Sequence, residues 1–122
     1  GKVIPFVCEG LPIEIIPLYF DLDGNFPNHD PNPLKTENLA DLQNKVRETR
    51  AHIGVAFDGD ADRCAFVDEM GRAIGCDIIT ALLAKQILEK EKGAPIVYDL
   101  RSSWFVPEEI KAAGGAPHRE RV

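Results

Sequence analysis

Three aspartates and an arginine, all within six residues, are the side chains of this sequence best suited to chemistry. Asp58, Asp60 and Asp62 alternate with a glycine and an alanine, and Arg63 follows directly. In a tight loop this spacing lets three carboxylates turn toward one point, where their charges repel unless a cation lies among them. Hard oxygen ligands suit Mg²⁺, Ca²⁺ or Mn²⁺ rather than zinc or copper. An arginine beside such an ion suggests a bound phosphate, because both groups would hold it.

Three other interpretations of this loop stay open on the residues alone. The loop could be a solvated hairpin connection without a ligand. It could be an EF-hand, since Glu69 falls at position 12 when Asp58 is position 1, but Arg63 then stands where that loop needs glycine, and the flanks look strand-like. It could also be the Asp-x-Asp pair of a phosphatase with Asp58 as nucleophile, although the further lysine and acidic pair cannot be placed.

The segment around the aspartates resembles the metal loop of the α-D-phosphohexomutases, the phosphomannomutase/phosphoglucomutase group. The match runs over Gly-Val-Ala-Phe-Asp-Gly-Asp-Ala-Asp-Arg at residues 54–63. Upstream, the segments 23–29, 31–33 and 37–39 are similar to the stretch that precedes this loop in the family. Downstream, Tyr-Asp-Leu-Arg-Ser-Ser at residues 98–103 is similar to the start of its third domain. These segments follow in the family's order and cover most of the chain.

The resemblance implies an intramolecular phosphotransferase, an isomerase that interconverts hexose 1-phosphate and hexose 6-phosphate. A phosphoserine donates its phosphoryl group to the sugar, and the bisphosphorylated sugar then turns over and returns the other phosphate. By position, Asp58, Asp60 and Asp62 would hold Mg²⁺, and Arg63 would be the catalytic residue at the reacting phosphate. Phosphomannomutase, with or without phosphoglucomutase activity, is the favoured member, and phosphoglucosamine mutase is the near alternative. A non-catalytic Ca²⁺-binding module is the alternative from another class.

The nucleophilic serine that the family uses is not found in this sequence. Its Thr-Ala-Ser-His-Asn-Pro-like loop is absent, and the serines present, Ser102 and Ser103, stand before a predicted helix, where capping is the expected role. The resemblance therefore implies a middle portion that binds metal, depends on the remaining domains of the enzyme as partners, and does not turn over a hexose phosphate by itself.

Composition favours an ordinary globular domain of 122 residues. A net charge of −6 argues against a nucleic acid or an anionic membrane surface as partner. No apolar run approaches ~20 residues, and no signal peptide is visible, although the sequence does not begin with Met and a removed leader stays open. Three cysteines without metal spacing predict reduced, mostly buried thiols, and hence a cytoplasmic protein.

Strand and helix patterns alternate along the chain. An apolar start over 3–7, ending by Gly10, predicts a helix, and residues 13–20 predict a strand before a loop. Thr36 is expected to cap a helix reaching about residue 50, and Asp77 to cap one that ends at Gly93, with an apolar face of isoleucines and leucines. Residues 53–57, 64–68 and 95–100 predict strands. Residues 104–113 predict a helix, with Trp104 in the core.

This order predicts an α/β fold, a three-layer sandwich with a mixed, mainly parallel sheet and helices on both faces. The strands on either side of the aspartates are too close for a crossover helix and should pair antiparallel. A composition break near Gly93 divides the chain. The resemblance implies that residues 1–93 are most of the metal-binding second domain and that residues 94–122 are the start of the third.

Overall fold

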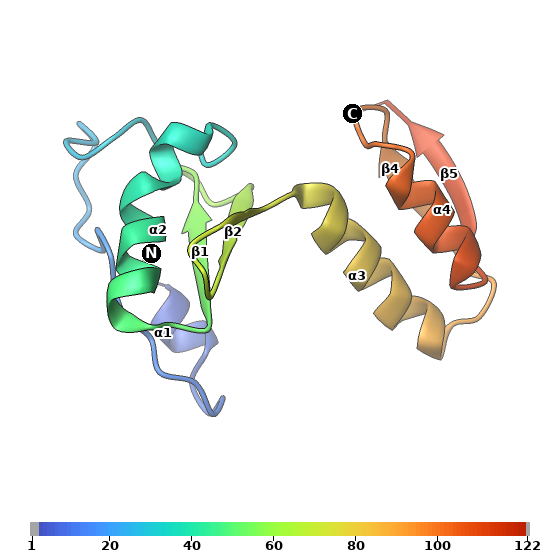
Figure 1. Cartoon of the computed structure of the whole chain (residues 1–122), viewed down its shortest axis with the longest axis horizontal. Coiled ribbons are helices and arrows are strands. Elements are labelled where there is room, and N and C mark those ends of the chain that lie inside the picture. Colours follow the sequence, from blue (N-terminus) through green and yellow to red (C-terminus); the bar gives the residue numbers. More distant parts are fainter. Residues whose placement is uncertain (1–2, 122) are drawn as a thin grey trace. The chain divides into compact units, whose positions relative to one another are not determined.

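A computed structural model describes residues 3–121 and has a mixed α/β fold (Figure 1). The chain forms two compact units, residues 1–73 and 74–122, which are described separately. The division into units falls before the boundary that the composition places near Gly93, because the helix that precedes Gly93 packs within the second unit. Among the described residues, no helix is both long enough and apolar enough to cross a membrane.

The first unit packs one helix against a short sheet. It contains α1 (Ile4–Val7), a 3-10 turn η1 (Thr36–Leu39), α2 (Ala40–Thr49), β1 (Ile53–Phe57) and β2 (Cys64–Asp68), and it ends at β3 (Ala73–Ile74). The sheet has the order β1-β2-β3, and β1 pairs antiparallel with β2, as the short connection predicts. Helix α2 packs on β1 and β2 (Figure 1).

The core of the first unit lies between α2 and this sheet. Alternate residues of β2 face the helix, so Ala65 and Val67 are buried against Leu39 and Val46. Gly54 of β1 allows the close approach, since a Cβ atom there would lie 2.7 Å from Cγ2 of Val46. The sheet that carries the acidic loop is therefore fixed by tight contact with α2.

The second unit packs two helices with a parallel strand pair. It contains α3 (Cys76–Lys90), β4 (Pro95–Asp99), α4 (Phe105–Ala112) and β5 (Ala116–Glu120). Strands β4 and β5 run parallel and are connected by α4. Helix α4 packs on α3 and on β5, and Ala84, Leu88, Val106 and Ile110 form the core. A Cβ atom on Gly115 would lie 2.6 Å from Cδ1 of Leu88, so this site also depends on glycine.

Most predicted elements are present, and the α/β class is confirmed, but several details of the prediction are wrong. The structure has no strand at 13–20, where Pro17 interrupts the segment and Tyr19 has a left-handed φ of 56°. The single mixed sheet expected from the pattern is replaced, among residues 3–121, by a three-stranded and a two-stranded sheet. Strand β5 was missed, because its exposed Arg119 and Glu120 give no apolar run.

The predicted caps are also wrong. Lys35 precedes η1, Gly75 precedes α3 and Trp104 precedes α4, in each case without a side-chain capping bond. Asp77 lies inside the first turn of α3, and its carboxylate accepts the backbone N–H of Ser103 at 3.0 Å. The backbone at these helix starts therefore does not use the Thr, Asp and Ser side chains that the sequence favours.

Burial departs from the expected pattern in the second unit. The buried residues of α3 are Ala81, Ala84 and Leu88. The isoleucines and the other leucines of this helix, which were expected to form its apolar face, are mostly exposed. Trp104 is 71% exposed, with the Arg119 guanidinium 5.2 Å from its ring centroid, so it is not a core residue. Cys76 is exposed as well, whereas Cys8 and Cys64 are half-buried, and all three thiols are free.

Candidate metal centre

The acidic loop is the connection between β1 and β2. The last strand pair is Phe57 with Cys64, and the loop closes directly beyond it. The N–H of Asp58 donates to the carbonyl of Arg63 at 3.2 Å, and the N–H of Ala61 donates to the carbonyl of Asp58 at 3.3 Å. Ala61 has a left-handed φ of 63°, a conformation that few non-glycine residues adopt. These bonds hold the loop as a compact turn at one edge of the sheet.

The loop brings the three predicted carboxylates together. One oxygen from each of Asp58, Asp60 and Asp62 lies within 4.8 Å of the others, and within the described part of the chain this is the one such group of potential metal ligands. Asp58 is buried, with 7% of its surface exposed, whereas Asp60 and Asp62 are exposed. One ligand is thus anchored in the unit, and the other two lie at its surface.

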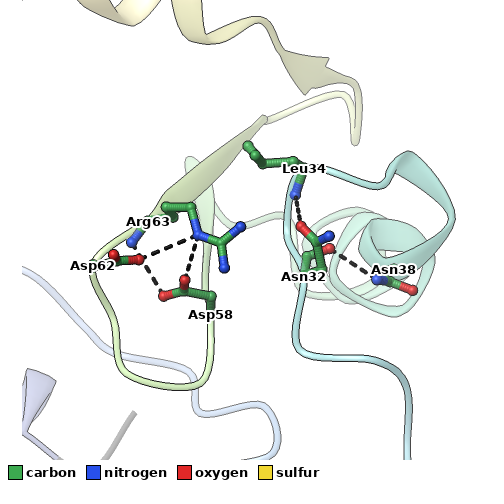
Figure 2. A network of polar contacts seen from close by, with 6 residues as sticks. All are labelled: Asn32, Leu34, Asn38, Asp58, Asp62 and Arg63. Carbon is green, nitrogen blue, oxygen red and sulfur yellow. Dashed lines mark hydrogen bonds and ion pairs between the residues drawn. The ribbon is translucent and has the colours of Figure 1, made fainter. Parts of the chain in front are cut away.

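Arg63 lies with these carboxylates, on the side that the sequence predicts. Its Nε atom donates to Oδ2 of Asp58 at 2.7 Å and to Oδ1 of Asp62 at 3.2 Å (Figure 2). Its backbone N–H donates to Oδ1 of Asp58 at 3.2 Å, so that both oxygens of Asp58 bond to Arg63. Within residues 3–121, the two terminal nitrogens of the guanidinium have no hydrogen-bond partner.

The pKa values of the aspartates reflect this crowding. Burial alone would raise the pKa of Asp58, but hydrogen bonds from the Arg63 backbone, from Asp62 and from the guanidinium hold it below its ordinary value. Contact with Asp58, and then the charges of Asp58 and Asp60, raise the pKa of Asp62. One guanidinium therefore does not balance three carboxylates, and the loop keeps an excess of negative charge.

The donor set fits a hard divalent cation. Carboxylate oxygens bound to Mg²⁺ at about 2.0–2.1 Å lie no more than about 4.2 Å apart. The observed oxygens, within 4.8 Å of one another, reach that spacing by small side-chain rotations. No cysteine or histidine belongs to this group of residues, which fits Mg²⁺, Ca²⁺ or Mn²⁺ better than zinc. The flanking elements are the strands β1 and β2, not the helices of an EF-hand.

A preceding loop lies against the acidic loop. A Cβ atom on Gly59 would meet Cζ of Phe26 at 3.5 Å and Cγ of Pro31 at 4.0 Å. Close by, Asn32 accepts the N–H of Leu34 through its side chain at 3.2 Å and the amide of Asn38 through its carbonyl at 2.9 Å (Figure 2). Sequence reasoning assigned no contact with the metal loop to Phe26, because no local pattern reveals which distant loop it touches.

Other candidate residues have ordinary structural contacts. Nε of Arg101, just beyond the end of β4, donates to Oδ2 of Asp99 at 2.6 Å and forms a local salt bridge. His29 packs edge-on to Tyr19, with ring centroids 5.9 Å apart, and its Nδ1 lies 2.9 Å from the carbonyl of Asp30. Both side chains are thus engaged in local contacts.

Comparison with known proteins agrees with this geometry. Residues 1–71 match the family described as phosphoglucomutase/phosphomannomutase, alpha/beta/alpha domain II. The chain is 46% identical over 112 residues to a phosphomannomutase of Vibrio cholerae, covering 92% of this chain and 24% of that protein. It is 44% identical over 115 residues to a phosphomannomutase/phosphoglucomutase of Pseudomonas putida, covering 94% of this chain and 25% of that protein.

A solved structure gives the same result. The X-ray structure of a phosphoglucomutase/phosphomannomutase family protein from Burkholderia thailandensis matches with a TM-score of 0.86 and 39% identity, over 89% of this chain and 24% of that one. The chain thus spans about a quarter of the length of the relatives it matches. On the family match over more than half of its residues, the chain belongs to the phosphoglucomutase/phosphomannomutase family.

Proposed function

We propose that this chain is the metal-binding portion of a phosphohexomutase that interconverts hexose 1-phosphate and hexose 6-phosphate. Mannose phosphate is the proposed main substrate, with glucose phosphate as a second one. The convergence of Asp58, Asp60 and Asp62 in a chain of this family is the observation that carries the proposal. The names of the relatives from Vibrio cholerae and Pseudomonas putida support the choice of sugars.

The three aspartates would hold Mg²⁺, which, when bound, supplies positive charge to the phosphoryl group in transfer. Asp58 is the fixed ligand, since it is buried and bonded to the loop backbone. Asp60 and Asp62 supply the exposed oxygens toward which a phosphate on serine or sugar would approach. The terminal nitrogens of Arg63 are donors that a phosphate can use in pairs, and this supports a catalytic role for that residue.

The domain organisation is part of the same proposal. The first segment of the chain would belong to the second, metal-binding domain, and the following segment would open the third. The family match that ends at residue 71, and the compact units that divide between Ala73 and Ile74, favour a boundary earlier than the Gly93 break. The remaining domains of the enzyme would be the partners of this portion. The free thiols of Cys8, Cys64 and Cys76 support a reducing, cytoplasmic location.

The test uses the complete enzyme in a coupled assay with mannose 1-phosphate and a catalytic amount of glucose 1,6-bisphosphate. We expect Asp60→Asn to lower turnover by on the order of a hundredfold or more, because the charge that neutralises the transferring phosphate is lost. Glu48→Gln is the matched control, since it removes an exposed carboxylate from α2 and should leave turnover unchanged. Equal turnover in both variants would contradict the proposed role of the loop.

A second comparison separates the members of the family. The same enzyme is assayed with mannose, glucose and glucosamine phosphates at equal concentration. Higher kcat/KM on mannose 1-phosphate supports the proposed substrate, whereas preference for glucosamine phosphate would identify the phosphoglucosamine branch. The isolated portion of residues 1–122 should stay at background in each assay, because its sequence holds no serine loop of the family type.

A further inference from the structure

The guanidinium of Arg63 is bonded to two of the carboxylates that would ligate the cation. Its Nε atom contacts Asp58 at 2.7 Å and Asp62 at 3.2 Å, and the Arg63 backbone N–H takes the second oxygen of Asp58. A cation that binds Asp58 therefore shares this carboxylate with the two donors of Arg63 or replaces one of them. The backbone N–H belongs to the closed loop, whereas the Arg63 side chain is 49% exposed and has solvent beside it.

We infer that Arg63 and the divalent cation compete for the carboxylates of Asp58 and Asp62, so that binding of the cation releases the guanidinium. The inference rests on the proposed function of this loop as a metal site. An ion about 2.1 Å from these carboxylates draws their negative charge toward itself, and this weakens the bonds that they make to Nε of Arg63. The double charge of the ion also repels a guanidinium that stays in contact with the same carboxylates.

Release of the guanidinium gives a sequence of events within the site. Before the cation binds, Arg63 offsets part of the repulsion among the three aspartates through its bonds to Asp58 and Asp62. After the cation binds, the planar donor group is no longer tied to carboxylates and all its N–H groups can turn to an anion beside the ion. Binding of the cation thus occupies the aspartates and at the same time frees Arg63 to bind a phosphate.

The neighbouring turn supplies a matched control. Arg72 donates from Nε to Oδ2 of Asp68 at 2.7 Å, the same atoms and distance as in the Arg63–Asp58 pair. Asp68 is not part of the group of three carboxylates. Substituting Arg72 removes one positive charge from the first unit, at the other end of β2, without removing a competitor from the metal loop.

The experiment measures Mg²⁺ binding to the complete protein by calorimetry in metal-free buffer. Arg63→Gln should tighten Mg²⁺ binding by about tenfold, because it removes both a competitor and a like charge. Arg72→Gln should change the affinity by less than about twofold, because Arg72 is not among the loop's contacts. In the wild-type protein, the ¹⁵N resonance of the Arg63 Nε–H should shift on saturation with Mg²⁺, and that of Arg72 should not.

The outcomes separate the inference from the function on which it rests. Unchanged or weaker Mg²⁺ binding in Arg63→Gln, beside clear binding to the wild type, would overturn the competition and leave the metal site in place. An Arg63 Nε–H resonance that does not move at saturation would overturn it in the same way. Absence of Mg²⁺ binding in the wild type and in Arg63→Gln would remove the metal site itself.

Discussion

The two ends of β2 carry nearly the same ion pair in different surroundings. At its start Arg63 donates from Nε to Asp58, and at its end Arg72 donates from Nε to Asp68, in both cases at 2.7 Å. The first pair is half covered and lies among three carboxylates. The second is exposed on its arginine side and has one carboxylate. The ion pair itself therefore does not distinguish a metal loop from a turn.

The two ends of β2 differ in how many of their carboxylates accept hydrogen bonds from backbone N–H groups. Oδ1 of Asp68 accepts the N–H groups of Met70 and Arg72 at 3.0 and 2.8 Å, so this carboxylate closes the turn. Asp58 has a similar bond to the backbone of Arg63. Asp60 and Asp62 accept no backbone bond among residues 3–121, and the bond from Nε of Arg63 to Asp62 leaves a net repulsion that raises the pKa of Asp62. The excess of carboxylates is what the proposed metal site would use, and the comparison can be tested at both ends of β2.

The largest expected difference concerns turnover. In the complete enzyme, Arg63→Ala should lower kcat by on the order of a hundredfold, because a donor to the reacting phosphate is lost. Arg72→Ala should leave kcat unchanged, since its partner only closes a turn. Both variants should keep a melting temperature close to that of the wild type, because both arginine side chains are partly exposed and both aspartates keep a backbone N–H donor. An equal loss of turnover in the two variants would assign Arg63 a structural role.

A second difference concerns glycines on either side of the loop's start. Gly54→Ala should lower the local free energy of unfolding by about 1–3 kcal/mol, because its Cβ would lie 2.7 Å from Cγ2 of Val46 and 3.0 Å from Leu42. Gly59→Ala should cost less than about 1 kcal/mol, since its nearest neighbour, Phe26, would be at ordinary contact distance, 3.5 Å. Amide hydrogen exchange across β1 and β2 in the complete protein measures both changes.

The acidic loop could be predicted from the sequence, but many of the contacts around it could not. Alternating aspartates, a short apolar strand and a following arginine are local patterns, so the carboxylate group and the antiparallel pair were predicted correctly. The absence of a strand at 13–20 and the absence of side-chain caps depend instead on the conformation of the backbone and on its hydrogen-bond partners. The contact between Phe26 and Gly59 joins residues far apart in the chain, and no local pattern contains it. Strand β5 was missed for another reason, because its exposed residues give no apolar run.

The two regions should also respond differently to pH. The Arg72 backbone N–H, more than its guanidinium, lowers the pKa of Asp68, so this carboxylate stabilises the turn at neutral pH, and the stabilisation is lost as pH falls below about 4. The pKa of Asp62 is raised in the folded loop, so its ionisation destabilises the folded loop as pH rises through that pKa. Without added metal, Asp68→Asn should lower protection from exchange at pH 7, and Asp62→Asn should raise it slightly.

Measurements of hydrogen exchange at low pH are the control for this prediction. Near pH 3, Asp68→Asn should differ less from the wild type than at pH 7, because the native carboxyl is then increasingly protonated in the folded and the unfolded protein. Added Mg²⁺ should cancel the gain in Asp62→Asn, since the wild-type carboxylate then has a cation to bind. A loss of protection in Asp62→Asn without metal would mean that its bond to Arg63 outweighs the repulsion.

The smallest expected effect is at Glu69, the residue that would be the bidentate ligand if the loop were an EF-hand. Glu69 lies in the turn after β2, on the far side of the strand from the loop, is exposed, and is not in the group of three carboxylates. Glu69→Gln should therefore leave the dissociation constants of Mg²⁺ and Ca²⁺ unchanged in calorimetry on the complete protein, while Asp60→Asn abolishes binding. A marked loss of Ca²⁺ affinity in Glu69→Gln, together with selectivity for Ca²⁺ over Mg²⁺, would require the β2 strand to fold away so that Glu69 reaches the aspartates. That result would make the loop a calcium module and would remove the distinction between the two ends of β2.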